Sequence, residues 1–202
     1  MQDDAMTLIL NNPGKPHVKR WTKAEYNADV ERGLFANKRR VFLYRGELIE
    51  MPPMGSLHAF GISNLTVWLT RTFDPENRIR IQLPFEAPGE SMPEPDGAVV
   101  THEQMRRRPH PNAALLIVEV SDSSIELDRE MAFEYAAARA PEYWIVNMPE
   151  RSIEVYRDPV ADATAILGFR YASHQVHGDG EVIATLLRPD VPVSAASLVA
   201  TE

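Results

Sequence analysis

The chain has 202 residues, of which 44% are hydrophobic and 25% charged, a mixture typical of a globular protein with a sizeable core. It contains no cysteine, which excludes disulfides, thiolate nucleophiles and cysteine zinc sites. The net charge of −8 argues against a protein that coats nucleic acid nonspecifically, since such binding needs many Lys and Arg contacts to phosphate.

We expect a single domain over residues 1–202, with residues 1–20 and 189–202 at its periphery. No apolar run approaches the roughly 18 residues that a membrane span needs. The acidic start of the chain also lacks the basic and apolar segments of a signal peptide. We therefore expect a cytoplasmic protein with no membrane partner.

The first half of the chain predicts two helices, a hairpin and a strand. Thr22 and Glu25 have the spacing of a capping box, which marks a helix start. Apolar residues from Ser56 to about Phe73 recur at helical spacing. The expected elements are a helix from 22 to about 33, a β-hairpin of strands 41–44 and 47–51, a helix 56–73 and a strand 78–83.

The second half predicts buried strands around one helix. Residues 101–112 are polar, basic and proline-bearing, so we expect an exposed loop there. The expected elements are strands 98–100 and 114–120, a helix 121–139 capped by its initial serines, strands 143–148, 152–156, 169–175 and 181–187, the last two joined by a turn at 178–180, and a loosely packed tail from 189. This order indicates an α/β protein with a mixed central β-sheet flanked by helices on both sides.

Two acids lie in or beside the predicted buried strands. Glu119 interrupts an apolar run, and Asp96 follows Pro95 at the start of the preceding strand. A buried carboxylate is unfavourable without a partner, and neighbouring strands are only about 4.8 Å apart, so the two acids can share a cation. Mg²⁺ prefers such oxygen ligands and would serve phosphodiester hydrolysis. Glu50, at the end of the hairpin, is a candidate third ligand.

Several motifs together carry a family resemblance. They are Trp21-Thr22 to Tyr26, Gly46-Glu47-Leu48-Ile49-Glu50-Met51, His58 after a Pro-x-Gly turn, Pro93-Glu94-Pro95-Asp96, Val118-Glu119-Val120-Ser121, Asp128-Arg129, Tyr135-Ala136 and Pro141-Glu142-Tyr143-Trp144-Ile145-Val146. In this order the chain resembles the Uma-two family of restriction endonucleases, within the PD-(D/E)xK nuclease superfamily. The resemblance covers most of the chain.

The resemblance implies a restriction-endonuclease-like core that binds Mg²⁺ (or Mn²⁺) and acts on DNA. Carried over by position, Asp96 is the acid of the Pro-Asp element, Glu119 the acid of the second element and Glu50 the upstream acid. Many superfamily members place a lysine two residues after the second acid, where this chain has Ser121. The resemblance to the Uma-two family implies that its lysine lies instead on the following helix, at the position that Met131 occupies in this chain.

Met131 departs from the chemistry that the resemblance implies. A thioether carries no charge and is a weak acceptor, so it cannot activate water or offset phosphate charge. Arg129 lies about 200° around the helix and should point away. His58 is the better substitute, because a neutral imidazole accepts a proton near pH 7.

Each candidate residue also has a structural interpretation. Asp96 caps a turn, Glu119 is neutralised by Arg80 or another basic residue, Glu50 is a solvated acid, and His58 bonds to backbone at a helix start. The leading functional hypothesis is a Mg²⁺-dependent DNA endonuclease, active as a homodimer and impaired by Met131. The alternative is a catalytically inactive nuclease-fold protein that serves as a DNA-binding or protein-interaction module.

Overall fold

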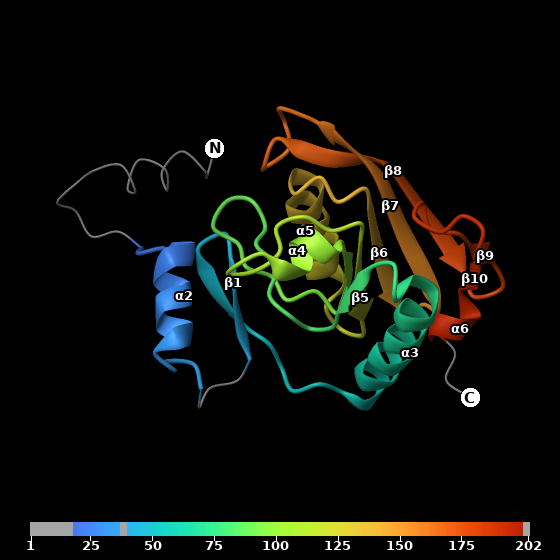
Figure 1. The fold of residues 1–202 in the computed structure, drawn as a ribbon, viewed down its shortest axis with the longest axis horizontal. Coiled ribbons are helices and arrows are strands. Elements are labelled where there is room, and N and C mark those ends of the chain that lie inside the picture. Colours follow the sequence, from blue (N-terminus) through green and yellow to red (C-terminus); the bar gives the residue numbers. More distant parts are fainter. Residues whose placement is uncertain (1–17, 37–39, 200–202) are drawn as a thin grey trace.

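The computed structural model describes residues 18–36 and 40–199, which form a mixed six-stranded sheet with helices on both faces (Figure 1). The strand order is β3-β4-β5-β6-β7-β8, and every neighbouring pair is antiparallel except β5 and β6. The strands are β3 (Arg78–Arg80), β4 (Gly97–Val100), β5 (Leu116–Ser121), β6 (Glu142–Asn147), β7 (Ser152–Ala161) and β8 (Phe169–Gly178). This confirms the predicted α/β class.

Each face of the sheet packs against one long helix. Helix α3 (Ser56–Phe73) covers the face that carries Val118 and Val120, with Leu65 and Leu69 in the core between them. Helix α5 (Ile125–Ala137), the crossover between the parallel strands β5 and β6, covers the opposite face. Because side chains alternate along β5, its odd and even residues meet different helices.

The N-terminal segment adds a helix and a hairpin beside the sheet. Helix α2 (Lys23–Glu31) has the predicted capping box, with Thr22 at the N-cap. Strands β1 (Val41–Tyr44) and β2 (Glu47–Glu50) form the predicted hairpin, whose turn uses left-handed backbone at Arg45 and Gly46. A bridge from Leu43 to Met92 attaches the hairpin to the loop that leads to β4.

Three predictions of local structure are wrong. The loop expected at 101–112 contains a short helix α4 (His102–Arg106), which Thr101 caps. The strand expected at 78–83 ends at Arg80, because left-handed backbone at Gln82 turns the chain. The segment 181–187 does not pair with β8; its short strand β9 (Val182–Ile183) pairs with β10 (Val193–Ser194).

The C-terminal segment packs more closely than its composition suggests. Val193, Leu198 and Val199 are buried against helix α3, and helix α6 (Ala196–Val199) ends the described chain. The expectation of loose packing from residue 189 is therefore wrong for this part. Residues 1–17, which the sequence places at the periphery, lie outside the described residues.

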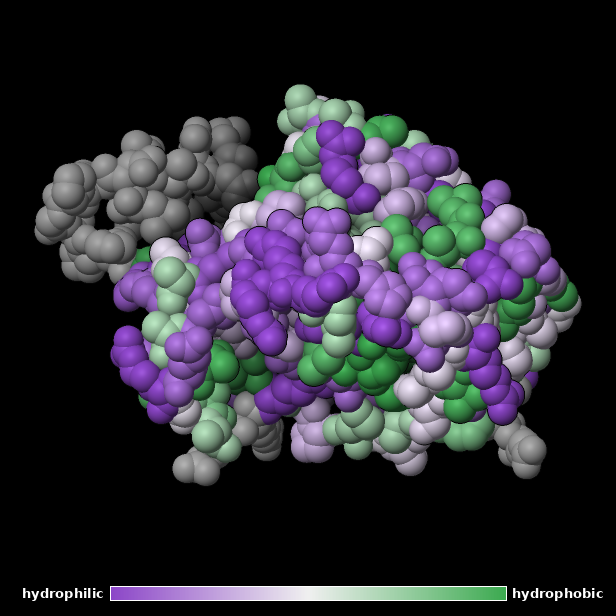
Figure 2. Space-filling model, viewed as in Figure 1, coloured by the Kyte–Doolittle hydropathy of each residue, from purple (hydrophilic) through white to green (hydrophobic). Residues whose placement is uncertain are grey.

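The face shown in Figure 2 is hydrophilic at its centre, over α4, with apolar residues scattered around it. None of the helices within 18–36 and 40–199 has the length and apolarity required to cross a bilayer.

Candidate active site

Asp96 is fixed at the entrance to β4 by contacts from three elements. Its side chain is buried, and its residue is only 7% exposed. Oδ2 accepts a hydrogen bond of 2.9 Å from the backbone N–H of Val120 in β5. Oδ1 accepts one of 3.1 Å from Gln82 Nε2 and lies 3.4 Å from His58 Nε2. A residue that merely capped a turn would not bind the neighbouring strand in this way.

Glu119 lies on the face of β5 that meets α5, where it faces Tyr135. Its Oε1 accepts a hydrogen bond of 2.6 Å from the Tyr135 hydroxyl, and its Oε2 accepts one of 2.9 Å from the backbone N–H of Asp96. Each of the two acids is therefore held by a backbone N–H of the strand that carries the other. The sheet register thus brings Asp96 and Glu119 together, as expected from the sequence.

The groups that donate to Glu119 are a backbone N–H and a tyrosine hydroxyl, so it gains no basic partner from them. Arg80, the basic residue that the sequence offers as a partner, donates instead to the carbonyl of Pro84. That alternative is wrong. Burial, with the nearby charges of Asp96 and Asp128, raises the pKa of Glu119 well above its ordinary value.

Asp128 is a third buried acid of the site, and the sequence interpretation missed it as a site residue. It lies in the first turn of α5 and is 8% exposed. Ser124 Oγ donates a hydrogen bond of 2.7 Å to its Oδ2. Burial raises the pKa of Asp128 to about 6. Ser124 occupies the N-cap as predicted, but its hydroxyl binds Asp128 and caps no backbone N–H.

One signal in the sequence could have found Asp128. In α5 the residues Asp128, Met131, Ala132 and Tyr135 are all buried, and their spacing of three and four places them on one helix face. The same stripe carries Tyr135 to Glu119. A carboxylate at the N-terminal end of that stripe therefore had to point toward the sheet.

Met131 lines a cavity of about 60 Å³ together with Asp96, Glu119 and Asp128. Its side chain is buried in the core under α5. The position that the resemblance assigns to a lysine thus adjoins three carboxylates. Arg129 points away, as predicted, because its guanidinium forms a 2.6 Å ion pair with Glu154 in β7.

His58 lies in the first turn of α3 and lines both this small cavity and a larger one of about 630 Å³. Its hydrogen bond with Asp96 raises its pKa, so the ring holds a proton more readily than a free histidine. This direction makes the neutral ring that the sequence suggests as a base less favoured than in a free histidine. Glu50, at the exposed end of β2, lines only the larger cavity and is not gathered with Asp96 and Glu119.

The donor set allows a hydrated divalent cation. Within residues 18–36 and 40–199, no three His, Asp or Glu side chains converge closely enough to enclose a metal ion. Mg²⁺ nevertheless keeps several waters and is often bound by one or two carboxylates. Each carboxylate oxygen of Asp96 and Glu119 retains acceptor capacity beyond its hydrogen bonds. Burial is the largest cause of the raised pKa of Glu119, and the charges of Asp96 and Asp128 add to it; a cation would offset those charges.

The Arg40 side chain also lines the small cavity, from the segment just before β1. Its Nε donates a hydrogen bond of 2.6 Å to Glu94, so its charge is already shared with a carboxylate. Arg40 and His58 are the cationic side chains among the described residues that line this cavity. The same cavity is lined by four carboxylates, those of Glu94, Asp96, Glu119 and Asp128, so these two side chains do not balance the acids.

A mixed sheet that carries a Pro-Asp turn beside a strand with a buried Glu, between two helices, defines a protein of the restriction-endonuclease-like class. The chain belongs to the Uma2 family, described as "Putative restriction endonuclease", whose sequence model matches residues 25–192. Enzymes of this class generally use divalent metal ions. A comparison with curated proteins found no match.

The fold is similar to the crystal structure of a protein from Anabaena variabilis titled a "putative nuclease belonging to DUF820". The TM-score is 0.64 at 13% sequence identity, and the match covers 82% of this chain and 94% of that one. At this identity the likeness supports the fold, and the activity is argued from the site.

Proposed function

We propose that this protein is a divalent-metal-dependent DNA endonuclease of the restriction type, in which Asp96 and Glu119 bind Mg²⁺ or Mn²⁺. The observation that carries the proposal is the reciprocal pair of hydrogen bonds that holds these two buried acids together beside Asp128. A structural role alone gives no reason to bury three carboxylates around one cavity, since each is costly to desolvate.

A bound metal ion would polarise a phosphoryl oxygen and lower the pKa of a water molecule. The protein's own groups hold the ligands in place: the Tyr135 hydroxyl orients Glu119, and the Val120 N–H orients Asp96. His58, whose proton is stabilised by Asp96, offers positive charge or a proton at the border of the two cavities. Glu50, which lines the larger cavity, would orient water on the solvent side of the metal.

Met131 lowers the expected rate without removing the acids. The absent ammonium would have stabilised charge or positioned water, and such groups are each worth roughly 10² to 10⁴ in rate. The same residue favours a second candidate function, a catalytically inactive DNA-binding or protein-interaction module. The two candidates differ in one observable, metal-dependent cleavage.

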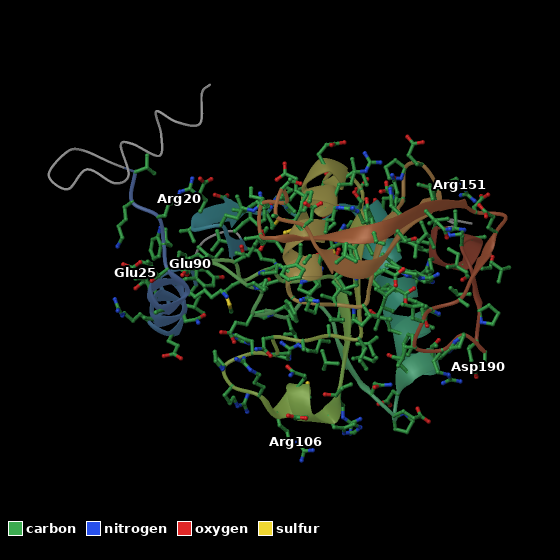
Figure 3. The ribbon with its side chains drawn as sticks, turned by 90° about the horizontal axis from the view of Figure 1, so that it is seen from above. Arg20, Glu25, Glu90, Arg106, Arg151 and Asp190 are labelled. Carbon is green, nitrogen blue, oxygen red and sulfur yellow. The ribbon has the colours of Figure 1, made fainter. Side chains whose placement is uncertain are left out.

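DNA contact requires basic side chains on the surface of the protein. The segment Arg106–Arg108 begins at the last residue of α4, and Arg106 extends outward from the ribbon (Figure 3). Arg107 is already paired with Glu86, so it offers less charge to phosphate. The sequence has a second basic cluster, Lys38-Arg39-Arg40, whose first two residues lie outside the described part of the chain. Cleavage of both strands would further call for a homodimer.

Calorimetric titration with Mg²⁺ and Mn²⁺ tests the ligand assignment. We expect Asp96→Asn and Glu119→Gln each to weaken binding at least about tenfold, as loss of a coordinating charge does. Glu50→Gln is the matched control for charge, because Glu50 lies outside the small cavity. Unchanged metal affinity in both site variants would overturn the assignment. Loss of affinity only in Glu50→Gln would move the site to the larger cavity.

A further inference from the structure

The larger cavity adjoins the small cavity that holds the buried acids. It has a volume of about 630 Å³. The two cavities share a border formed by Arg40, Met51, His58, Ser124 and Leu127. A molecule that reached the acids from this side would therefore leave a substantial part of itself in the larger cavity.

The walls of the larger cavity come from two connections. One is residues 51–55, which lead from the hairpin into α3 (Figure 1), and the other is residues 122–127, which lead from β5 into α5. The apolar side chains that line the cavity include Ile49 of β2 and Met51, Met54, Ile125 and Leu127 of the two connections. Met54 is 48% exposed although it is apolar. Covering such a side chain with a flat apolar group is favourable.

The charges on these walls do not suit a phosphate backbone. Glu50, Asp122 and Glu126 line the cavity, against Arg40 and His58 at its inner border. Asp122 lies against the connection to α3, with Oδ2 3.2 Å from the position that a Cβ on Gly55 would occupy. Negative walls repel phosphates but accept hydrogen bonds from the amino groups of bases.

The volume is also that of a small-molecule site. Pockets for single organic ligands typically measure about 300–1,000 Å³, and enzymes that extrude a base bind it in a pocket of the active site. A cavity of about 630 Å³ has room for one nucleobase with its sugar. Apolar walls with acidic hydrogen-bond acceptors suit an uncharged nucleobase. The cationic side chains at the inner border suit the phosphate attached to that base, which would lie at the buried acids.

We propose that the larger cavity receives an unpaired nucleobase beside the phosphate that is cut, so that the preferred substrate is single-stranded or locally unpaired DNA. The proposal rests on the proposed nuclease function and assigns its substrate class. It also accords with the net charge of −8, because extended contact with duplex phosphates requires many basic side chains.

Fluorescence anisotropy without metal tests the substrate class independently of cleavage. The probes are a labelled single strand, its blunt duplex, and the same duplex with a central unpaired bubble. We expect the single strand and the bubble to bind at least about tenfold more tightly than the duplex, the effect of packing one base. Met54→Ala should weaken binding of the unpaired probes by roughly threefold to tenfold and leave duplex binding unchanged.

Val67→Ala is the matched control, because Val67 is also 48% exposed and lies in α3 outside the walls of both cavities. It should change neither binding constant. Equal or tighter binding of the blunt duplex would overturn the proposal, as would equal effects of Met54→Ala and Val67→Ala.

Incubation of the same probes with Mn²⁺ separates the two proposals. Cleavage of the duplex as fast as the bubble contradicts the substrate class while the nuclease function stands. Preferential binding of unpaired DNA without any cleavage supports the cavity assignment and contradicts the catalytic function.

Discussion

Asp128→Asn should stabilise the metal-free protein at alkaline pH. Burial raises the pKa of Asp128 from its ordinary 3.8 to about 6. Each pKa unit corresponds to about 1.4 kcal/mol, so the ionised carboxylate destabilises the fold by at most about 3 kcal/mol above pH 6. Asparagine has nearly the same shape and can still accept the hydrogen bond from Ser124, so the substitution removes the charge and replaces one carboxylate oxygen by an amide group.

The sign of the pH dependence follows from the raised pKa. Between about pH 4 and pH 6 the folded protein binds more protons at Asp128 than the unfolded chain, so stability falls as the pH rises through this range. The raised pKa values of Glu119 and His58 act in the same direction and extend the decline upward. Exposed acids with lowered pKa, such as Glu25 and Asp162 at about 2, oppose it only in more acidic solution.

Urea denaturation near pH 5 and near pH 8, in the presence of a chelator, measures this effect. We expect the wild type to be more stable at the lower pH, and Asp128→Asn to gain stability mainly at the higher pH. Asp158→Asn, at an exposed position with left-handed backbone that asparagine accepts, is the control and should change little. A clear loss of stability near pH 8 in Asp128→Asn would refute the reasoning, because the carboxylate would then be stabilised by its surroundings.

Three further substitutions test the residues around the site. Tyr135→Phe removes the hydroxyl that donates to Glu119 and should lower the free energy of unfolding by about 1–3 kcal/mol in urea titrations; an unchanged value would contradict the contact. Gly61→Ala places a Cβ 2.6 Å from Val120 Cγ1, so the free energy of unfolding from calorimetry should fall by about 1–3 kcal/mol. An unaltered melting temperature would contradict this and show that α3 can shift away from β5 at little cost. Arg129→Ala should leave DNA nicking unchanged, since its guanidinium points away from the acids; a loss of nicking in the folded variant would place it in the site.

The sheet and its two long helices could be predicted from the sequence, because the local pattern of apolar and polar residues determines these elements. The helix from Ser56 to Phe73 was confirmed at both ends, because its apolar residues keep one period and the preceding prolines and Gly55 exclude an earlier start. Asp96 and Glu119 were predicted to lie together because a carboxylate beside or within an apolar strand requires a partner. Those two signals need no knowledge of the tertiary structure.

The remaining features depend on how separate elements meet. The spacing of buried residues in α5 places Asp128 on the face that meets the sheet, but it joins the site only because α5 packs on the face of β5 that carries Glu119, which the helix pattern does not specify. The position of Glu50 depends on where the hairpin lies relative to the sheet, which its own pattern leaves open. The C-terminal segment packs on α3 through a few apolar residues that are too short a run to show a period.

The most direct test of the central claim is nicking of supercoiled plasmid in Mg²⁺ and in Mn²⁺ by the wild type, Met131→Lys, Met131→Leu, and Met131→Lys combined with Asp96→Asn. If the buried acids form a nuclease site that lacks only its ammonium, Met131→Lys should nick roughly a hundredfold faster than the wild type. Met131→Leu should match the wild type, and the double variant should be inactive. A folded Met131→Lys protein that nicks no faster than the wild type, or a double variant that nicks equally well, would contradict the claim.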